Sequence, residues 1–203
     1  MGKSYIFKVL ILAVCICLWG SQAIAAESPQ AVVQNGADQV RKLLNEYPQA
    51  TQERREKIRE VANQYFDFSG IARLSLGPEW RRLSPEKRQE FTQEFSRLLF
   101  GTYIGDIERY AYQNVRYHQR PIDQDHVVVG GALRDQNGQV ISIDYYLHRV
   151  NGEWRVYDVA AEGVSLVRNY RNQFDSILAN SSFDRLSMIL KQRVAQMCAL
   201  NRC

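Results

Sequence analysis

The chain has 203 residues, of which 45% are hydrophobic and 24% are charged. These proportions are typical of a folded globular protein, and they exclude a disordered or collagen-like chain. The formal net charge is +4, and two of the basic residues, Lys3 and Lys8, lie in a first segment that holds no acid. The remainder is therefore close to neutral, which argues against nucleic acid as a partner.

Residues 1–25 have the three-part layout of a secretory signal peptide. A short basic stretch ends at Lys8, an apolar run spans 9–19, and Ala23-Ile24-Ala25 forms a small-residue cleavage site. The apolar run is shorter than the about 20 residues that cross a membrane as a helix. We expect cleavage after Ala25, export, and one mature domain over 26–203; a retained membrane anchor is the alternative.

Cysteine usage agrees with an exported protein. Cys15 and Cys17 fall in the signal segment, which leaves Cys198 and Cys203. An oxidising compartment permits a disulfide between these two. Residues five apart on a helix are separated by at least ~7.5 Å, and a disulfide needs less than about 7 Å between Cα atoms. A bridge therefore requires the last helix to end near Cys198.

The segment 28–112 is predicted to be helical. Ser28, Asp67 and Ser84 stand where N-caps belong, a second helix begins near Thr51, and Gly77-Pro78 ends the third. Apolar residues recur at spacings of three and four, which marks a buried face on each helix. The longest helix opens at Ser84 and carries the apolar residues Phe91, Phe95, Leu98, Leu99, Tyr103 and Ile107.

From residue 114 to residue 161 the apolar period changes to two, which predicts four strands over 114–120, 125–134, 139–150 and 153–161. Asp135-Gln136-Asn137-Gly138 and Asn151-Gly152 are typical hairpin turns, so we expect an antiparallel meander. Helices return over 164–198, with a cap near Ser182. Helices followed by a meander and further helices indicate an α+β fold.

The third predicted strand separates two kinds of side chain. Ile141, Ile143, Tyr145 and Leu147 alternate with Ser142, Asp144, Tyr146 and His148. A twisted sheet with helices against its apolar face forms an ordinary core, and if it curves it can wrap a cavity. The alternation alone does not distinguish a filled core from a cavity.

Motifs for catalysis are weak. The chain has three histidines, all on predicted strands. The run Gly163-Val164-Ser165-Leu166-Val167 begins like a nucleophile elbow, but Val167 stands in place of the second glycine. Asp158 and Glu162 form either a carboxylate pair or strand-end caps, and the position of Glu162 just before a helix favours a cap. We expect no enzyme activity and no metal or other cofactor.

Three stretches resemble a known family. They are Phe66-Asp67-Phe68-Ser69-Gly70-Ile71-Ala72-Arg73-Leu74-Ser75-Leu76-Gly77-Pro78-Glu79-Trp80, then Leu83-Ser84-Pro85-Glu86-Lys87-Arg88-Gln89-Glu90-Phe91, and the run from Gly152 to Arg171 that contains W-R-V-Y-D-V-A-A-E-G-V-S. Together they are similar to the MlaC, or toluene-tolerance, family of periplasmic phospholipid carriers. The resemblance covers nearly the whole mature chain, with Ala161 as a departure where many members have a larger aliphatic residue.

The resemblance implies a fold and a function. The fold is a curved four-stranded antiparallel sheet, similar to nuclear-transport-factor-like (NTF2-like) domains, packed with N-terminal and C-terminal helices around a lipid cavity. The ligand is a diacyl phospholipid. The partners are an inner-membrane Mla ABC transporter complex and an outer-membrane lipoprotein–porin complex, between which a periplasmic carrier shuttles lipid to maintain outer-membrane lipid asymmetry.

Family placement and predicted direction together suggest which side chains line the cavity. We expect Ile143 and Tyr145 on the sheet side, facing the long helix, and Val164 and Val167 near the mouth. The full predicted lipid-binding set is Phe68, Leu76, Phe95, Leu99, Tyr103, Ile143, Tyr145, Val164 and Val167. The alternatives are an exported hydrolase or isomerase with a pocket of similar shape, and a periplasmic adaptor or chaperone with a solid core.

Overall fold

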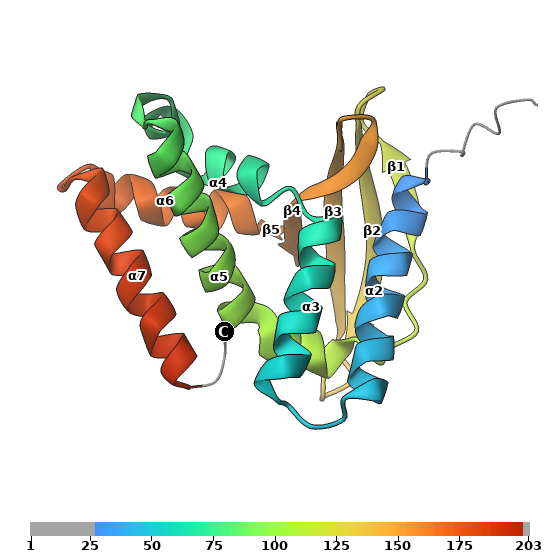
Figure 1. Ribbon diagram of the computed structural model, residues 1–203. Helices are drawn as coiled ribbons and strands as arrows, with labels where there is room; N and C mark the ends of the chain where they lie inside the picture. Colours follow the sequence, from blue (N-terminus) through green and yellow to red (C-terminus); the bar gives the residue numbers. More distant parts are fainter. Residues whose placement is uncertain (1–26, 201–203) are drawn as a thin grey trace, which may run out of the picture.

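The computed structural model describes residues 27–200. A five-stranded sheet stands beside a group of helices, and two further helices cover one face of the sheet (Figure 1). The expected signal peptide over 1–25 lies outside the described residues and stays a prediction. No helix within residues 27–200 combines the length and apolar character needed to cross a membrane.

The helices begin where hydroxyl or carboxylate side chains can accept a backbone N–H. In each case the capping oxygen accepts from the residue three positions on, which satisfies one of the unpaired donors of the first turn. These caps are Ser28, Thr51, Asp67, Ser84, Ser165 and Ser182. The predicted helix starts at Ser28, Thr51, Asp67, Ser84 and Ser182 are therefore confirmed.

The helices in chain order are α2 (Pro29–Glu46), α3 (Gln52–Tyr65), α4 (Phe68–Leu76), the 3-10 helix η1 (Gly77–Arg82), α5 (Pro85–Tyr110), α6 (Leu166–Leu178) and α7 (Phe183–Ala199). Gly77 takes a φ of 62°, which glycine adopts at little cost, and so ends α4 as expected. Cys198 lies in the last turn of α7 and is not free. Because Cys203 lies outside the described residues, its pairing with Cys198 stays a prediction.

The sheet is an antiparallel meander in the order β1 (His118–Pro121), β2 (His126–Arg134), β3 (Val140–Val150), β4 (Glu153–Ala161) and β5 (Val164–Ser165). It has five strands, not the expected four. The added strand holds only two residues, too few for a period of two to be visible in the sequence. Residues 164 and 165 are therefore strand, and the C-terminal helices begin at Leu166 instead of 164.

The first strand is also shorter and later than expected, because residues 114–117 are not strand. The turn between β3 and β4 agrees with its prediction: Asn151 and Gly152 have φ values of 52° and 87°. Positive φ at both central residues is typical of a two-residue type I′ hairpin. The curved NTF2-like form implied by the resemblance stays a prediction.

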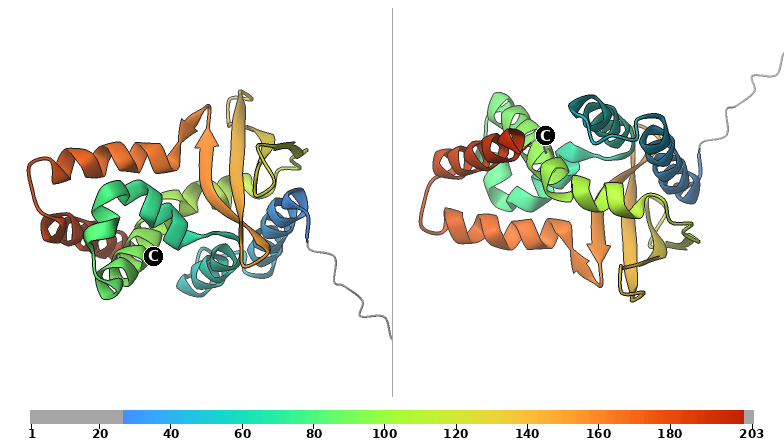
Figure 2. Two further views of the ribbon diagram at one scale, coloured as in Figure 1. Left: turned by 90° about the horizontal axis from the view of Figure 1, so that it is seen from above. Right: turned by 90° about the horizontal axis from the view of Figure 1, so that it is seen from below.

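The two faces of the sheet differ as the alternation in β3 predicts. On one face, Leu147 and the partly buried Tyr145 pack with Val32 and Val33 of α2. Figures 1 and 2 show α2 and α3 over this face. On the other face, the ring of Tyr157 contacts Tyr146 and His148. Tyr157 is the residue left unpaired where the β3–β4 register shifts.

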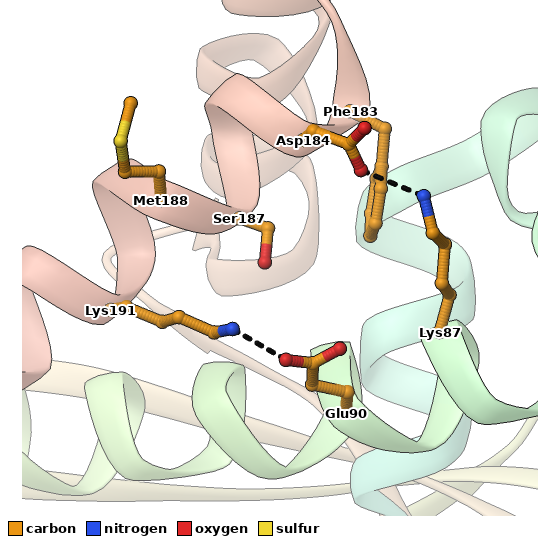
Figure 3. A pocket seen from close by; sticks show the side chains of 7 residues that line it. All are labelled: Lys87, Glu90, Phe183, Asp184, Ser187, Met188 and Lys191. Atoms are coloured by element: carbon orange, nitrogen blue, oxygen red, sulfur yellow. Dashed lines mark hydrogen bonds and ion pairs between the residues drawn. The ribbon is translucent and has the colours of Figure 1, made fainter.

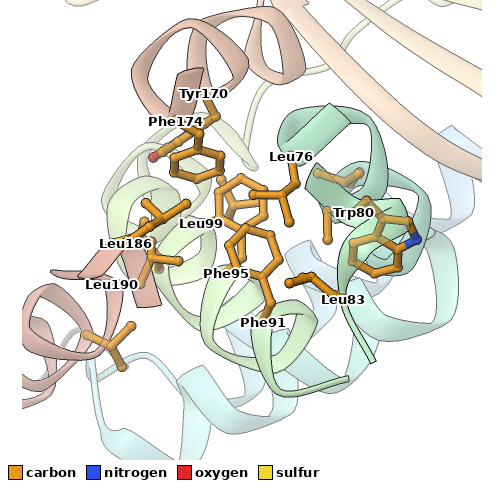
Figure 4. Close-up of a cluster of buried hydrophobic side chains, with 14 residues drawn as sticks. Leu76, Trp80, Leu83, Phe91, Phe95, Leu99, Tyr170, Phe174, Leu186 and Leu190 are labelled. Atoms are coloured by element: carbon orange, nitrogen blue, oxygen red, sulfur yellow. The ribbon is translucent and has the colours of Figure 1, made fainter. Parts of the chain in front are cut away.

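The buried apolar residues form three clusters. The helical cluster joins α4, α5, α6 and α7, and includes Leu76, Phe91, Phe95, Leu99 and Phe174 (Figure 4). The sheet cluster joins α2 to β2, β3 and β4. A third cluster joins Leu44 of α2 and Ile58 of α3 to Phe100 and Ile104 of α5. The long helix α5 therefore joins the helical cluster to the third cluster, and α2 joins the third cluster to the sheet cluster.

Candidate functional site

The family-like segment from Trp154 to Ser165 fixes α6 to the sheet. The Asp158 carboxylate on β4 accepts hydrogen bonds from the Ser165 hydroxyl and, at 3.0 Å, from the backbone N–H of Val167. Ser165 in turn accepts from Arg168 N at 3.0 Å and caps α6. A charged acceptor at a helix N-terminus also complements the helix dipole. Ser165 is thus engaged as a helix cap, not held by a histidine as a nucleophile would be.

Glu162 and Gly163 form the turn that returns the chain from β4 to β5. Their φ values are 51° and 75°, and Ala161 pairs with Val164 across the turn. The Glu162 carboxylate accepts from the backbone N–H and the hydroxyl of Ser142 on β3. The expectation that Glu162 caps the next helix is therefore wrong. Asp158, not Glu162, accepts an N–H of the first turn of α6, because the β4–β5 turn directs Glu162 back across the sheet.

Three of the nine predicted lipid-binding residues lie inside the helical cluster. Leu76, Phe95 and Leu99 are 0%, 1% and 4% exposed. The Phe95 ring contacts Tyr170 at 4.9 Å and Phe174 at 5.2 Å between centroids (Figure 4). Side chains packed in this way have almost no surface left for a ligand, so their role at a binding site would be to support the residues around them.

Three others lie at the edge of the same cluster. Phe68, Tyr103 and Val167 are partly buried and pack against it. The Phe68 ring stacks on Phe66 at 5.7 Å. Phe66 packs against both the helical cluster and the sheet cluster, and so marks where the two meet. We give the name border to Phe66 together with partly buried apolar residues that pack against one of the two clusters. Against the helical cluster these are Phe68, Tyr103, Leu166 and Val167, and against the sheet cluster they are Tyr117, Tyr145 and Val159.

The remaining three predicted residues differ from one another. Tyr145 belongs to the border and faces the sheet cluster, between its pairing partners Val129 and Val159. Ile143 is two residues earlier on the same strand and partly buried. Val164 on β5 is 65% exposed. The structure thus brings five of the nine to or beside the border, namely Phe68, Tyr103, Val167, Tyr145 and Ile143, and it leaves Val164 on the surface.

Burial changes the acidity of the border tyrosines. It raises the pKa of Tyr103 to about 12, with smaller contributions from Tyr170 and Asp106. Burial also raises the pKa of Tyr145, and contact with Tyr117 adds to this. Both side chains nevertheless keep part of their surface accessible. Phenols withdrawn from bulk water but not sealed by packing are suited to the polar–apolar boundary of a ligand.

One contact between the helical part and the sheet could not be predicted from the sequence. His148 Nε2 of β3 lies 2.9 Å from Asp67 Oδ2, and the other Asp67 oxygen accepts from Gly70 N at 2.8 Å. Asp67 therefore both caps α4 and links this helix to the sheet. Nothing in the local pattern signals this pair, because 81 residues separate the two side chains.

A groove between α5 and α7, of about 320 Å³, is the other candidate for a ligand (Figure 3). Ion pairs cross it between Lys87 and Asp184 at 2.7 Å and between Lys191 and Glu90 at 2.5 Å. An acyl chain placed here would lie among four charged groups, which is unfavourable. Within residues 27–200 no grouping of His, Cys, Asp and Glu is suited to a metal ion. The border is thus the better candidate site for an apolar ligand.

Comparison with known proteins identifies the family of this chain. Residues 30–192 match the family model described as MlaC protein. Two relatives are each 24% identical to this chain. One is the toluene tolerance protein ttg2D of Pseudomonas putida, aligned over 85% of this chain and 83% of its own length. The other is the intermembrane phospholipid transport system binding protein MlaC of Haemophilus influenzae, aligned over 97% and 96%.

A solved structure is also similar. It is the phospholipid-binding protein of Ralstonia solanacearum in complex with a phospholipid, with 26% sequence identity and a TM-score of 0.71. The match covers 84% of this chain and 99% of that one. The similarity therefore extends over most of this chain.

Proposed function

The chain belongs to the MlaC family, and from this premise we propose that it is a periplasmic phospholipid carrier. It holds the acyl chains of a diacyl phospholipid at the border between the helical and sheet clusters. It shuttles lipid between outer-membrane and inner-membrane Mla complexes and so maintains outer-membrane lipid asymmetry. The observation that carries the proposal is the set of apolar and aromatic side chains of the border, which remain only partly buried against the two clusters.

Such a carrier must stabilise acyl chains about as strongly as a bilayer does. Burial of a methylene group stabilises by about 0.8 kcal/mol, so two chains of roughly 15 methylenes give on the order of 24 kcal/mol relative to water. A bilayer offers nearly the same stabilisation, and the net preference of the carrier must therefore be small. A partner complex can then shift the balance toward uptake or release.

The predicted residues divide into three roles under this proposal. Phe68, Tyr103, Ile143, Tyr145 and Val167 touch the acyl chains, because each keeps accessible surface at or beside the border. Leu76, Phe95 and Leu99 form the packed support behind them. Val164, exposed on β5 next to the start of α6, lies at the mouth.

Native mass spectrometry tests the proposal. The protein is expressed from its full sequence and purified without added lipid. A carrier is expected to retain diacyl phospholipid, which adds the mass of one or more lipids and is identified after extraction. A mass that equals the polypeptide alone, before and after incubation with phospholipid vesicles, would contradict the proposal and favour the adaptor alternative.

A further inference from the structure

Residues 66–68 lead from α3 to α4 and lie beside β4. Phe66 forms an isolated parallel bridge with Val156, and Asp67 N donates to Val156 O at 2.9 Å. The rings of Phe66 and Phe68 stack at 5.7 Å with an interplanar angle of 17°. Phe66 packs against both the helical cluster and the sheet cluster. Asp67 therefore stands directly between the two members of an aromatic stack that belongs to the border.

Both oxygens of the Asp67 carboxylate are engaged. Oδ1 accepts from Gly70 N at 2.8 Å, and Oδ2 lies 2.9 Å from Nε2 of His148 on β3. A carboxylate can only accept, so Nε2 supplies the hydrogen of the second bond. The two side chains are 17% and 16% exposed, which limits competition from water. Gly70 makes this arrangement possible, since a Cβ atom there would clash with Oδ2.

Ring contacts hold the His148 imidazole in the orientation that reaches Asp67. Its ring lies 4.8 Å from the ring of Tyr157 on β4 and 6.2 Å from the ring of His126 on β2. Nδ1 of His126 in turn lies 2.9 Å from Asp123, so this second imidazole has an acidic partner of its own. His148 and Asp67 therefore form a defined pair between β3 and the start of α4.

The pair restrains the aromatic stack through the backbone. Under the proposed function Phe68 touches the acyl chains, and the Phe66 ring is stacked on it. A shift of residues 66–68, which would move both rings together, has to break the bond between Asp67 and His148. A hydrogen bond to a charged group stabilises more than a bond between neutral groups does, and partial burial strengthens it further.

We propose that the pair of His148 and Asp67 positions the stack of Phe66 on Phe68 and so slows the entry and release of lipid at the border. This inference rests on the proposed function and adds a control of its rate. His148 is a positioning residue, because it acts through Asp67 and not through contact with the lipid. A purely structural contact would change the free energy of unfolding but leave the exchange rate of the folded protein unaltered.

The test measures how fast the folded protein exchanges its lipid. The protein is expressed from its full sequence and mixed, with its co-purified lipid, with vesicles of phosphatidylethanolamine and phosphatidylglycerol that carry deuterated acyl chains. Native mass spectrometry follows the uptake of the heavier lipid with time. His148→Leu and Asp67→Ser each remove the bond, and the serine can still cap α4. Both variants are expected to exchange about tenfold faster than the wild-type protein, the effect of one hydrogen bond to a charged group.

Two further variants serve as controls. His148→Gln keeps an N–H donor at this position and is expected to exchange at nearly the wild-type rate. Glu108→Gln removes the carboxylate that pairs with Arg54 at 2.6 Å, an ion pair between α3 and α5 that does not involve α4. It is expected to lower the stability but to keep the wild-type exchange rate. Circular dichroism shows which variants are folded, and either His148→Leu or Asp67→Ser alone is sufficient if the other does not fold.

Each outcome has a separate meaning. Wild-type exchange rates in folded His148→Leu and Asp67→Ser overturn the inference and leave the carrier function standing. Faster exchange in Glu108→Gln overturns it as well, because the rate would then follow overall stability. If His148→Gln exchanges as fast as His148→Leu, the hydrogen bond to Asp67 is not the cause. If the wild-type protein neither retains lipid nor takes it up from the vesicles, the proposed carrier function itself fails.

Discussion

Tyr103 illustrates how burial alters a single side chain at the border. Its pKa is raised from 10.0 to about 12, first by burial and then by Tyr170 and Asp106. The folded state therefore binds the phenolic proton more tightly than the unfolded state does. Stability from this group is present below pH 10.0 and is lost as the pH rises toward about 12.

Replacement of Tyr103 by Phe is expected to reduce this alkaline loss of stability. Urea unfolding over a series of pH values gives the free energy of unfolding of the wild-type and variant proteins. The control is Tyr112→Phe, since Tyr112 is 53% exposed. If the alkaline fall has the same size with and without the Tyr103 hydroxyl, the desolvation of this phenol does not affect folding.

Val164 tests the placement of the mouth. Its side chain is 65% exposed, so Val164→Glu is expected to leave the fold intact by circular dichroism. A charge at the mouth disfavours the passage of acyl chains, and we expect less co-purified lipid by native mass spectrometry. Val140→Glu is the matched control, because Val140 is also an exposed apolar strand residue, at 56%. Unchanged lipid in a folded Val164→Glu protein would place the mouth elsewhere.

At the scale of elements, α4 depends on one carboxylate for two purposes. Asp67 caps the helix through Gly70 N and contacts His148 on β3. Asp67→Ala removes both and is expected to lower the free energy of unfolding by about 2 kcal/mol. Ser182→Ala removes only the cap of α7 and is expected to cost about 1 kcal/mol. Urea denaturation compares the two, and equal losses would mean that the contact with His148 adds nothing.

The sequence anticipates the elements where a local rule determines them. Ser28, Thr51, Asp67 and Ser84 begin helices because their side chains satisfy donors three residues away. The Asn151-Gly152 turn needs only positive φ. The start of β1 and the whole of β5 were not predicted, because the formation of a short edge strand depends on pairing with the neighbouring strand. The sequence favoured Glu162 as the cap of α6, which is wrong, since the β4–β5 turn decides which carboxylate faces α6.

At the scale of the whole molecule, the described residues that define the border are apolar or aromatic. The buried guanidinium of Arg54 is paired with Glu108 at 2.6 Å in another part of the fold. Recognition of one headgroup would need a charged or strongly polar group at the site. The arrangement instead favours a carrier that accepts different headgroups.

We therefore expect phosphatidylethanolamine, phosphatidylglycerol and phosphatidylcholine with identical chains to bind within about tenfold of one another. One charge-assisted hydrogen bond to a headgroup would already exceed that range. Competition binding followed by native mass spectrometry measures the ratios. A larger preference for one headgroup would contradict the expectation and indicate a direct contact that the border residues do not supply.

By itself, the sequence determined the α+β order, the helix starts, the hairpin turns and the face on which each β3 side chain lies, because these depend on hydrogen bonds and periodicity within a few residues. Tertiary structure alone decided which apolar side chains are fully buried and which keep solvent-accessible surface. Phe95 and Tyr103 stand on the same helix with similar patterns, yet Phe95 is enclosed by Tyr170 and Phe174, while Tyr103 lies partly buried at the edge of the helical cluster. That difference arises from packing between segments far apart in the chain, which no local pattern encodes.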